Sequence, residues 1–143
     1  MRIIGLDVGD RTIGVAVSDE MGWTAQGLTT IRRSNIERDL AAIKEYVNTY
    51  NAEEVMIGLP KNMDGSLGKR ANLVLEFVDS LKARLSIPIT TWDERLSTVA
   101  VTKVLLEADM SRKKRKRVVD KLAAIYILQG YLDSRKGTKE IDL

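Results

Sequence analysis

The hydrophobic positions at the start of the chain predict three strands in succession. Arg2 to Val8 is apolar on both faces until one aspartate interrupts it, which is typical of a central strand buried on both sides. A Gly9-Asp10-Arg11 turn follows, and Thr12 to Ser18 alternates as a second strand. A third short strand is expected within Gly27 to Arg32. The short connections predict that the three strands form an antiparallel meander.

Beyond this meander the spacing alternates between helix and strand. Ser34 with Glu37 is typical of a capping box, and apolar residues then recur at helical spacing through about Tyr50. A strand, a helix, a strand and two helices are expected next, over Glu54 to Leu59, Leu67 to Leu85, Pro88 to Asp93, Ser97 to Ala108 and Val118 to Leu132. The polar residues Asp133 to Leu143 are expected to be frayed.

This order of elements predicts an α/β fold with a mixed five-stranded sheet flanked by helices. The opening meander supplies the antiparallel half of the sheet, and the strand-helix-strand units supply a parallel half through right-handed crossovers. The first strand is then central, and the expected strand order is third, second, first, fourth, fifth. At 143 residues the chain has the length of one domain, and residues 1–143 are taken as that domain.

Composition narrows the chemistry that the chain can perform. Hydrophobic residues make up 44% and charged residues 30%, which excludes an intrinsically disordered chain. No apolar stretch approaches the roughly 20 residues of a membrane span and no charged-then-apolar leader precedes Ile3, so a cytoplasmic protein is expected. The absence of Cys and His excludes disulfides, zinc-finger or haem ligation and Ser-His or Cys-His nucleophiles. A bound metal would have to be a hard cation held by oxygen.

Six consecutive basic residues, Arg112 to Arg117, concentrate the positive charge. The chain has 23 Lys and Arg against 20 Asp and Glu, so outside this run 17 basic residues face 20 acidic ones. A local cationic site on a mildly acidic body favours a polyanionic partner, because clustered Lys and Arg release condensed counterions from phosphates. A solvated surface is the alternative. The position of the run between two predicted helices favours the polyanion.

Carboxylates gather at one predicted edge of the sheet. Asp7 lies in a strand buried on both faces, where a carboxylate must be paired, protonated or bound to a cation, unless it caps the Gly9 turn. Asp93 and Glu94 end the last strand, at the carboxyl edge where open α/β sheets bind ligands. Asp120 opens the last helix, where the helix dipole would favour it without any function.

These acids match the requirements of a Mg²⁺ or Mn²⁺ site, because hard cations prefer carboxylate oxygens and the chain has no histidine. Two such ions would clamp an in-line phosphoryl displacement. In the expected strand order Asp7 and the last-strand acids are two strands apart, about 9 to 10 Å at the usual strand spacing. The strand between them ends in Gly58, which would leave the intervening space open. Alternation turns Asp93 and Glu94 to opposite faces; the longer Glu94 is favoured as the ligand, and Asp93 is expected to bond to loop amides.

Basic and polar side chains are expected to surround the acids. The loop Pro60 to Arg70 combines glycines with cations ahead of a helix, which suits phosphate contact, although the glycines would also serve a plain turn. The candidate nucleic-acid contacts are Arg11, Lys61, Asn62, Lys69, Arg70, Arg95, Arg112, Lys113, Lys114, Arg115, Lys116 and Arg117. Trp23 and Trp92 could stack on bases, but core or rim packing is the more frequent role of a single tryptophan.

Four blocks of the sequence resemble the signature of the YqgF (RuvX) family: Gly5 to Asp19, Gly58 to Gly65, Asp93 to Thr98 and Asp120 to Ala124. They occur in order and span nearly the entire chain. The resemblance implies the RNase H-like fold, a relation to the RuvC Holliday-junction resolvases and a nuclease for the 5′ end of pre-16S rRNA. It also implies a catalytic set of Asp7, Asp93 or Glu94, and Asp120, with Asp7, Glu94 and Asp120 as the expected metal ligands.

The sequence departs from the RuvC pattern in two places. Ile57-Gly58-Leu59 stands where RuvC has a glutamate on the fourth strand. Of the paired aspartates that open the final RuvC helix only Asp120 is present, with Arg117 three residues earlier. This smaller set of acids argues against strict junction resolution. The favoured function is a Mg²⁺- or Mn²⁺-dependent nuclease that acts on structured RNA, with pre-16S rRNA and ribosomal particles as expected partners and a monomer or weak homodimer as the expected state.

Three other functions stay open at this point. A Holliday-junction resolvase would act on branched DNA and would require a dimer with two matched sites. Asp7 to Thr12 resembles the phosphate-binding hairpin of the actin-like ATPases, but those proteins bind nucleotide between two domains and this chain has the length of one. A non-catalytic RNA-binding factor would use the acids to hold a structural ion, and cleavage by an Asp7→Asn variant would distinguish it from an enzyme.

Overall fold

The computed structural model describes residues 1–96 and 122–135 of the chain. The elements in order are β1 (Ile3–Val8), β2 (Thr12–Ser18), β3 (Ala25–Arg32), α1 (Ile36–Tyr50), β4 (Glu54–Leu59), α2 (Lys69–Lys82), β5 (Ile89–Asp93), the 3₁₀ helix Glu94–Leu96, and a helix over residues 122–135. The helix expected over Ser97 to Ala108, the basic run and Asp120 lie outside the described residues.

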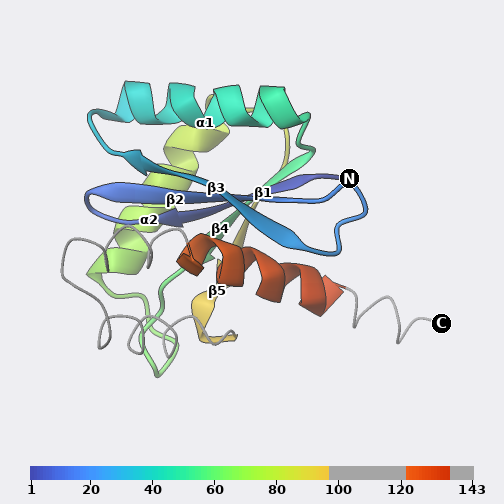
Figure 1. The fold of residues 1–143 in the computed structure, drawn as a ribbon. Helices are drawn as coiled ribbons and strands as arrows, with labels where there is room; N and C mark the ends of the chain where they lie inside the picture. Colours follow the sequence, from blue (N-terminus) through green and yellow to red (C-terminus); the bar gives the residue numbers. More distant parts are fainter. Residues whose placement is uncertain (97–121, 136–143) are drawn as a thin grey trace, which may run out of the picture.

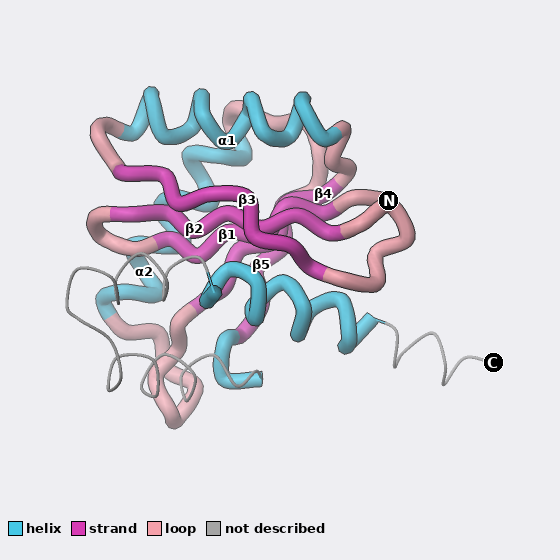
Figure 2. The backbone as a smooth tube through the Cα atoms, in the orientation of Figure 1, coloured by secondary structure: helices cyan, strands magenta, loops and turns pink. Residues whose placement is uncertain are grey.

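The five strands form one mixed sheet in the order β3-β2-β1-β4-β5, as the sequence predicts. β1 and β2 are antiparallel and so are β2 and β3, while β4 runs parallel to both β1 and β5. Figure 1 shows β1 in the middle of the sheet, and Figure 2 shows the three antiparallel strands side by side. The carboxyl ends of β1, β4 and β5 therefore meet at one edge.

Two hydrophobic clusters cover the two faces of the sheet, which explains why every residue of β1 and β4 is buried. Leu6 and Val8 of β1 face the cluster that α1 and α2 complete. Ile3 faces the second cluster, which the helix 122–135 completes (Figure 1). That helix lies close to the sheet at Gly5, where a Cβ would be only 2.8 Å from Leu128 Cβ. None of the helices in the described part of the chain is long and apolar enough to cross a membrane.

The predicted cap of α1 is wrong. Asn35, and not Ser34, is the N-cap residue, and its side chain accepts a hydrogen bond from Arg38 N at 3.0 Å. The N–H of Ser34 donates instead to Asp39 at 3.2 Å, and the same buried carboxylate binds Arg33. Ser34 is thus engaged by Asp39, a carboxylate in the first turn of the helix. The capping-box pattern considers only Ser34 and Glu37 and therefore does not include this contact.

The bounds of two other helices also differ from the prediction. α2 begins at Lys69 and not at Leu67, because Gly68 is its N-cap and the preceding residues form a hydrogen-bonded loop. The last helix continues to residue 135, beyond the predicted end at Leu132. Its final turn is held to the sheet, since Arg135 binds the buried Glu54 at 3.2 Å. The first three residues of the expected frayed tail are therefore helical.

Candidate active site at the carboxyl edge of the sheet

Asp7 is a buried carboxylate at the centre of the sheet, with 8% of its surface exposed. Alternation along β1 places it on the same face as Ile3 and Gly5, the face that the helix 122–135 covers. Its register partner on β2 is Gly14, and on β4 the residue after the Leu6–Ile57 pair is Gly58. The strands on both sides of Asp7 therefore have a glycine level with it. The sequence predicts this role for Gly58, whereas Gly14 is found only from the register.

Glu94 extends over β4 to this same place. A Cβ on Gly58 would be 2.7 Å from Glu94 Oε1 and 3.0 Å from Ile127 Cδ1 of the last helix. Gly58 pairs with Trp92 of β5, and Glu94 follows directly after the end of that strand. The Glu94 carboxylate thus lies over the glycine of β4; that Asp7 and Glu94 share a metal across it stays a prediction.

Asp93 forms a close ion pair with Arg95. Arg95 Nη2 lies 2.7 Å from Asp93 Oδ2, and Asp93 Oδ1 accepts the backbone N–H of Arg95 at 2.9 Å. The hydrogen bond from the Arg95 side chain holds the pKa of Asp93 below its ordinary value of 3.8, with the positive charge of Lys61 adding to the effect. Asp93 therefore stays ionised and bonded to the turn that follows it. Of the two adjacent acids, it is Glu94 whose carboxylate lies over β4.

The loop 60–68 lies next to this pair and is held by its own hydrogen bonds. Asn62 Nδ2 donates to Ser66 Oγ at 3.0 Å, and Asp64 Oδ1 accepts from the same hydroxyl at 2.6 Å. Arg95 Nη1 donates to the Met63 carbonyl at 3.1 Å. Two residues predicted to contact nucleic acid, Asn62 and Arg95, thus use their polar groups within the protein.

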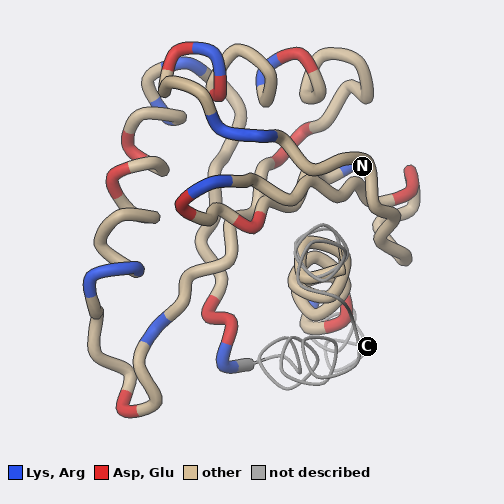
Figure 3. Tube along the Cα trace, turned by 60° about the vertical axis from the view of Figure 1, so that its left-hand side comes forward, with Lys and Arg blue, Asp and Glu red and all other residues tan. Residues whose placement is uncertain are grey.

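The other candidate phosphate contacts within the described residues lie around this edge. Lys61 begins the loop, Lys69 and Arg70 open α2, and Arg11 lies in the turn between β1 and β2. The side chains of Arg11, Lys69 and Arg70 are exposed, and Lys61 is half-buried. Figure 3 marks the basic and acidic positions of this part of the chain. These four residues match the sequence prediction in their position and remain candidates for phosphate contact.

The two tryptophans differ in their surroundings. Trp92 is half-buried and packs against the cluster under the last helix, which agrees with a packing role. Trp23 is 50% exposed in the loop before β3, and its carbonyl accepts a hydrogen bond from Gln129 at 3.0 Å. Trp92 lies near the end of β5, level with Gly58, whereas Trp23 lies outside the strand ends that carry Asp7 and Glu94.

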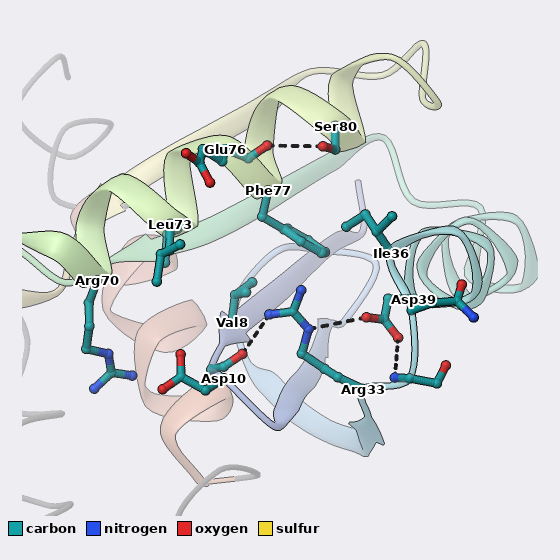
Figure 4. A pocket seen from close by; sticks show the side chains of 14 residues that line it. Val8, Asp10, Arg33, Ile36, Asp39, Arg70, Leu73, Glu76, Phe77 and Ser80 are labelled. Atoms are coloured by element: carbon teal, nitrogen blue, oxygen red, sulfur yellow. Dashed lines mark hydrogen bonds and ion pairs between the residues drawn. The ribbon is translucent and has the colours of Figure 1, made fainter.

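A cavity of about 550 Å³ lies on the opposite face of the sheet, between α2, the start of α1 and the β1–β2 turn (Figure 4). Its central cation, Arg33, binds Asp39 at 3.2 Å and donates to the Gly9 carbonyl at 2.9 Å, with its guanidinium over the Phe77 ring. The lining mixes both charges with apolar side chains, so it does not form a cationic surface for phosphates. The cavity reaches the carboxyl end of β1 at Val8, Gly9 and Asp10, but it lies on the face of the sheet opposite to Asp7.

Comparison with known families decides the relationship. The family model described as RuvX, Holliday junction resolvase, matches residues 1–134. The chain belongs to the RuvX family. Curated RuvX relatives are similar along their whole length: a protein of Moorella thermoacetica is 61% identical over 93% of this chain and 95% of its own, and one of Desulforamulus reducens is 57% identical over 94% and 98%. Both are named "Putative pre-16S rRNA nuclease".

Solved structures show that the RuvX chain has the RuvC-type RNase H fold. Thermus thermophilus RuvC in complex with a Holliday junction substrate is similar with a TM-score of 0.62 at 17% identity, covering 96% of this chain and 98% of its own. The fowlpox virus Holliday junction resolvase is similar with a TM-score of 0.52 at 14% identity, covering 94% and 99%. The expected RNase H-like fold is therefore confirmed, and hydrolysis of phosphodiester bonds is the chemistry of this family of nucleases.

The carboxylates fit a divalent cation in kind. Asp7 is a buried acid level with glycines on both neighbouring strands, and Glu94 lies over β4, so both offer oxygen atoms, the donors that Mg²⁺ and Mn²⁺ prefer. Among the described residues no three acids form a complete metal-binding group. The third expected ligand, Asp120, lies outside them, as do Arg112 to Arg117.

Proposed function

We propose that this chain is a divalent-metal-dependent endonuclease that processes the 5′ end of pre-16S rRNA in the cytoplasm. The observation that carries the proposal is the alignment of Asp7, Gly58 and Glu94 across three parallel strand ends, with cationic residues around them. The names of the curated relatives support the substrate. Asp7, Glu94 and Asp120 would hold Mg²⁺ or Mn²⁺.

Each side chain of this edge has a defined part in the proposed reaction. When bound, the divalent ions supply an activated water and stabilise the leaving oxygen. Asp7 and Glu94 fix the position of the cleaved phosphate by presenting carboxylate oxygens from two strands that the sheet holds rigidly. Lys61 and Lys69 bind neighbouring phosphates and orient the RNA backbone. The glycine on β4 leaves the room that the Glu94 carboxylate occupies.

The substitution Asp7→Asn tests the proposal, because it removes one charge and keeps the shape of the side chain. Cleavage of a precursor RNA with an extended 5′ end should fall at least about a hundredfold, since the variant lacks one of the metal ligands. Mn²⁺ binding measured by calorimetry should weaken in parallel, and RNA affinity should stay within about twofold. The control is Asp79→Asn, an exposed acid on α2, which should leave all three measurements unchanged.

Cleavage by Asp7→Asn at the parental rate would contradict the proposed site. Absence of cleavage by the parental protein with both metals, together with intact RNA binding, would favour the non-catalytic RNA-binding factor. The same assay with a four-way DNA junction tests resolution of Holliday junctions, the activity in the description of the family model. We expect the junction to be the poorer substrate, because the position of the fourth-strand acid of RuvC is Gly58 here.

A further inference from the structure

Arg95 connects the end of β5 to the loop 60–68 through all three of its guanidinium nitrogens. Nε donates to Asp93 Oδ1 and Oδ2 at 3.1 and 3.0 Å, and Nη2 donates to Oδ2 at 2.7 Å. Nη1 points the other way and donates to the Met63 carbonyl at 3.1 Å. Only a planar fork with several fixed donors can hold both partners at once; a lysine ammonium is a single point charge.

Asp93, the first partner of Arg95, also shapes the turn that carries Glu94. Its Oδ1 accepts the N–H of Arg95 at 2.9 Å and so closes the chain over Glu94 at the start of the 3₁₀ helix. The strand alternation ends at this turn, and the side chain of Glu94 extends over Gly58. One carboxylate thus fixes the Arg95 guanidinium and the backbone on both sides of Glu94.

The loop 60–68, which contains the second partner, is shaped to receive Arg95. Gly65 has a φ of +88°, and a Cβ there would be 3.3 Å from Arg95 Nη1, so a side chain at this position would be strained and would crowd the guanidinium. The N–H of Gly65 donates to Asn62 O at 2.9 Å, and the N–H of Asn62 donates to Ser66 O at 3.0 Å. The loop is therefore a compact unit that meets Arg95 at the Met63 carbonyl.

We propose that Arg95 is a positioning residue that couples the loop 60–68 to Glu94; this role rests on the proposed function. The coupling keeps the cations at the two ends of the loop, Lys61 and Lys69, at a fixed distance from the Glu94 carboxylate. The RNA backbone that these lysines bind then meets the acids in one geometry. Arg95 acts through the loop and the turn, and it is not itself a phosphate contact, in contrast to the expectation from the sequence.

The variant Arg95→Lys tests this role, because it keeps the positive charge and removes the fork. Hydrogen exchange of the Asn62 and Gly65 amides should become about tenfold faster, since the loop is then no longer attached to β5. In cleavage of the precursor RNA, kcat should fall about ten- to a hundredfold with KM within about twofold, because the acids and the bound phosphates are no longer aligned. The matched control is Arg84→Lys, since Arg84 also pairs with a carboxylate, that of Glu37, but between α1 and the segment after α2. It should leave loop exchange and kinetics unchanged.

Loop exchange is measured without RNA or metal, so it tests the coupling separately from the nuclease. Unchanged loop exchange in Arg95→Lys would overturn the coupling, whatever the cleavage rate. Faster exchange with an unchanged kcat would overturn the positioning role. A third outcome would also overturn the proposal: KM rises in Arg95→Met but equals the parental value in Arg95→Lys, and kcat is unchanged in both variants. That result would make Arg95 a phosphate contact. Failure of the parental protein to cleave RNA, with faster loop exchange in Arg95→Lys, would count against the proposed function and leave the coupling supported.

Discussion

At the scale of single residues, the candidate site depends on positions that carry no side chain. Asp7 has glycine beside it on each neighbouring strand, Gly14 on β2 and Gly58 on β4. The sequence resemblance predicts that the second of these glycines stands where RuvC has a glutamate. The side chain of Glu94, which follows β5, extends into the space above this glycine. The same edge can thus hold a carboxylate over β4 although β4 itself supplies none.

The variant Gly58→Ala should show how strongly cleavage depends on this space. The new Cβ would be 2.7 Å from Glu94 Oε1, so the carboxylate must move. We expect kcat for the precursor RNA to fall about tenfold or more, with RNA affinity unchanged, because a displacement of about 1 Å is costly at a reacting centre. Gly58→Leu should have a larger effect.

The new Cβ would also be 3.0 Å from Ile127 Cδ1, so a control must separate the two contacts. It would also be 3.1 Å from Ile127 Cγ2, so adding Ile127→Ala, which removes both methyl groups, gives the helix room. If Glu94 is the cause, the double variant stays as slow as Gly58→Ala. Recovery of the parental rate would instead assign the effect to a shift of the last helix.

The choice between Asp93 and Glu94 can be narrowed from the sequence but not made with certainty. Alternation along a strand separates the two side chains, and a bond to a turn amide, which Asp93 makes, is expected for the acid outside the site. What holds Asp93 there is Arg95, which also reaches a carbonyl 32 residues earlier in the chain. A contact over that separation depends on how the loop 60–68 folds, and no local pattern contains it.

At the scale of elements, the helix 122–135 is fixed to the sheet by a small polar cluster at its end. Glu54, a buried acid at the start of β4, accepts hydrogen bonds from the Tyr131 hydroxyl and from Arg135. Gln129 of the same helix accepts a hydrogen bond from the N–H of Ala25 at 2.9 Å. Ala25 begins β3, the strand that pairs with β2. These contacts set the axial position of the helix against the strands that carry Asp7 and Gly58.

The variant Tyr131→Phe should lower the free energy of unfolding by about 1 to 2 kcal/mol, because the buried Glu54 then has one donor fewer. Burial, followed by the hydrogen bond to Glu54, raises the pKa of Tyr131 above its ordinary value of 10.0. The unfolded chain therefore releases this proton first, so the stabilisation is complete below about pH 10 and is lost as the pH rises through the folded-state pKa. Denaturant titrations between pH 7 and 11 should show this decline in the parental protein and not in the variant.

The control for this helix is Tyr126→Phe, since Tyr126 lies on the same helix and is 40% exposed. It should leave the free energy of unfolding within about 0.5 kcal/mol of the parental value. Equal effects of the two substitutions would contradict a specific bond between Tyr131 and Glu54.

The strands are easier to predict than the helix ends. All five strands start and end within two residues of the predicted positions, because buried runs and turn residues mark them directly. The predicted N-cap of α1 is wrong by one residue, since Ser34 and Asn35 both suit a cap and the deciding partner is the buried Asp39. The last helix is longer than predicted because its final turn meets Glu54, which is 81 residues away in the chain.

At the scale of the whole molecule, charge is expected to control binding of RNA. Replacing Arg112 to Arg117 by glutamine, two residues at a time, should weaken binding to RNAs of unrelated sequence by similar factors. The slope of log K against log salt concentration should fall in magnitude by about 0.7 for each phosphate that the protein no longer neutralises. Filter binding at several salt concentrations measures this slope. Lys82→Gln, at the end of α2 away from the loop 60–68, is the control and should leave the slope unchanged. An unchanged slope in the paired variants would make the run a solvated surface.

The close contact between Gly5 and Leu128 bears on how the protein is synthesised. Residues 1–96 contain the five strands that the structure describes, with Asp7 and Glu94, and among the described residues it is 122–135 that cover one apolar face of the sheet. While the ribosome is still translating the middle of the chain, Ile3, Ala16 and Met56 have no partner helix, and Ile127 is not yet above Gly58. The nascent chain thus carries two of the acids on an unfinished scaffold. Under the proposed function, the ability to cut RNA arises only as translation of the chain is completed, so a partly made copy is no threat to the rRNA of the ribosome that produces it.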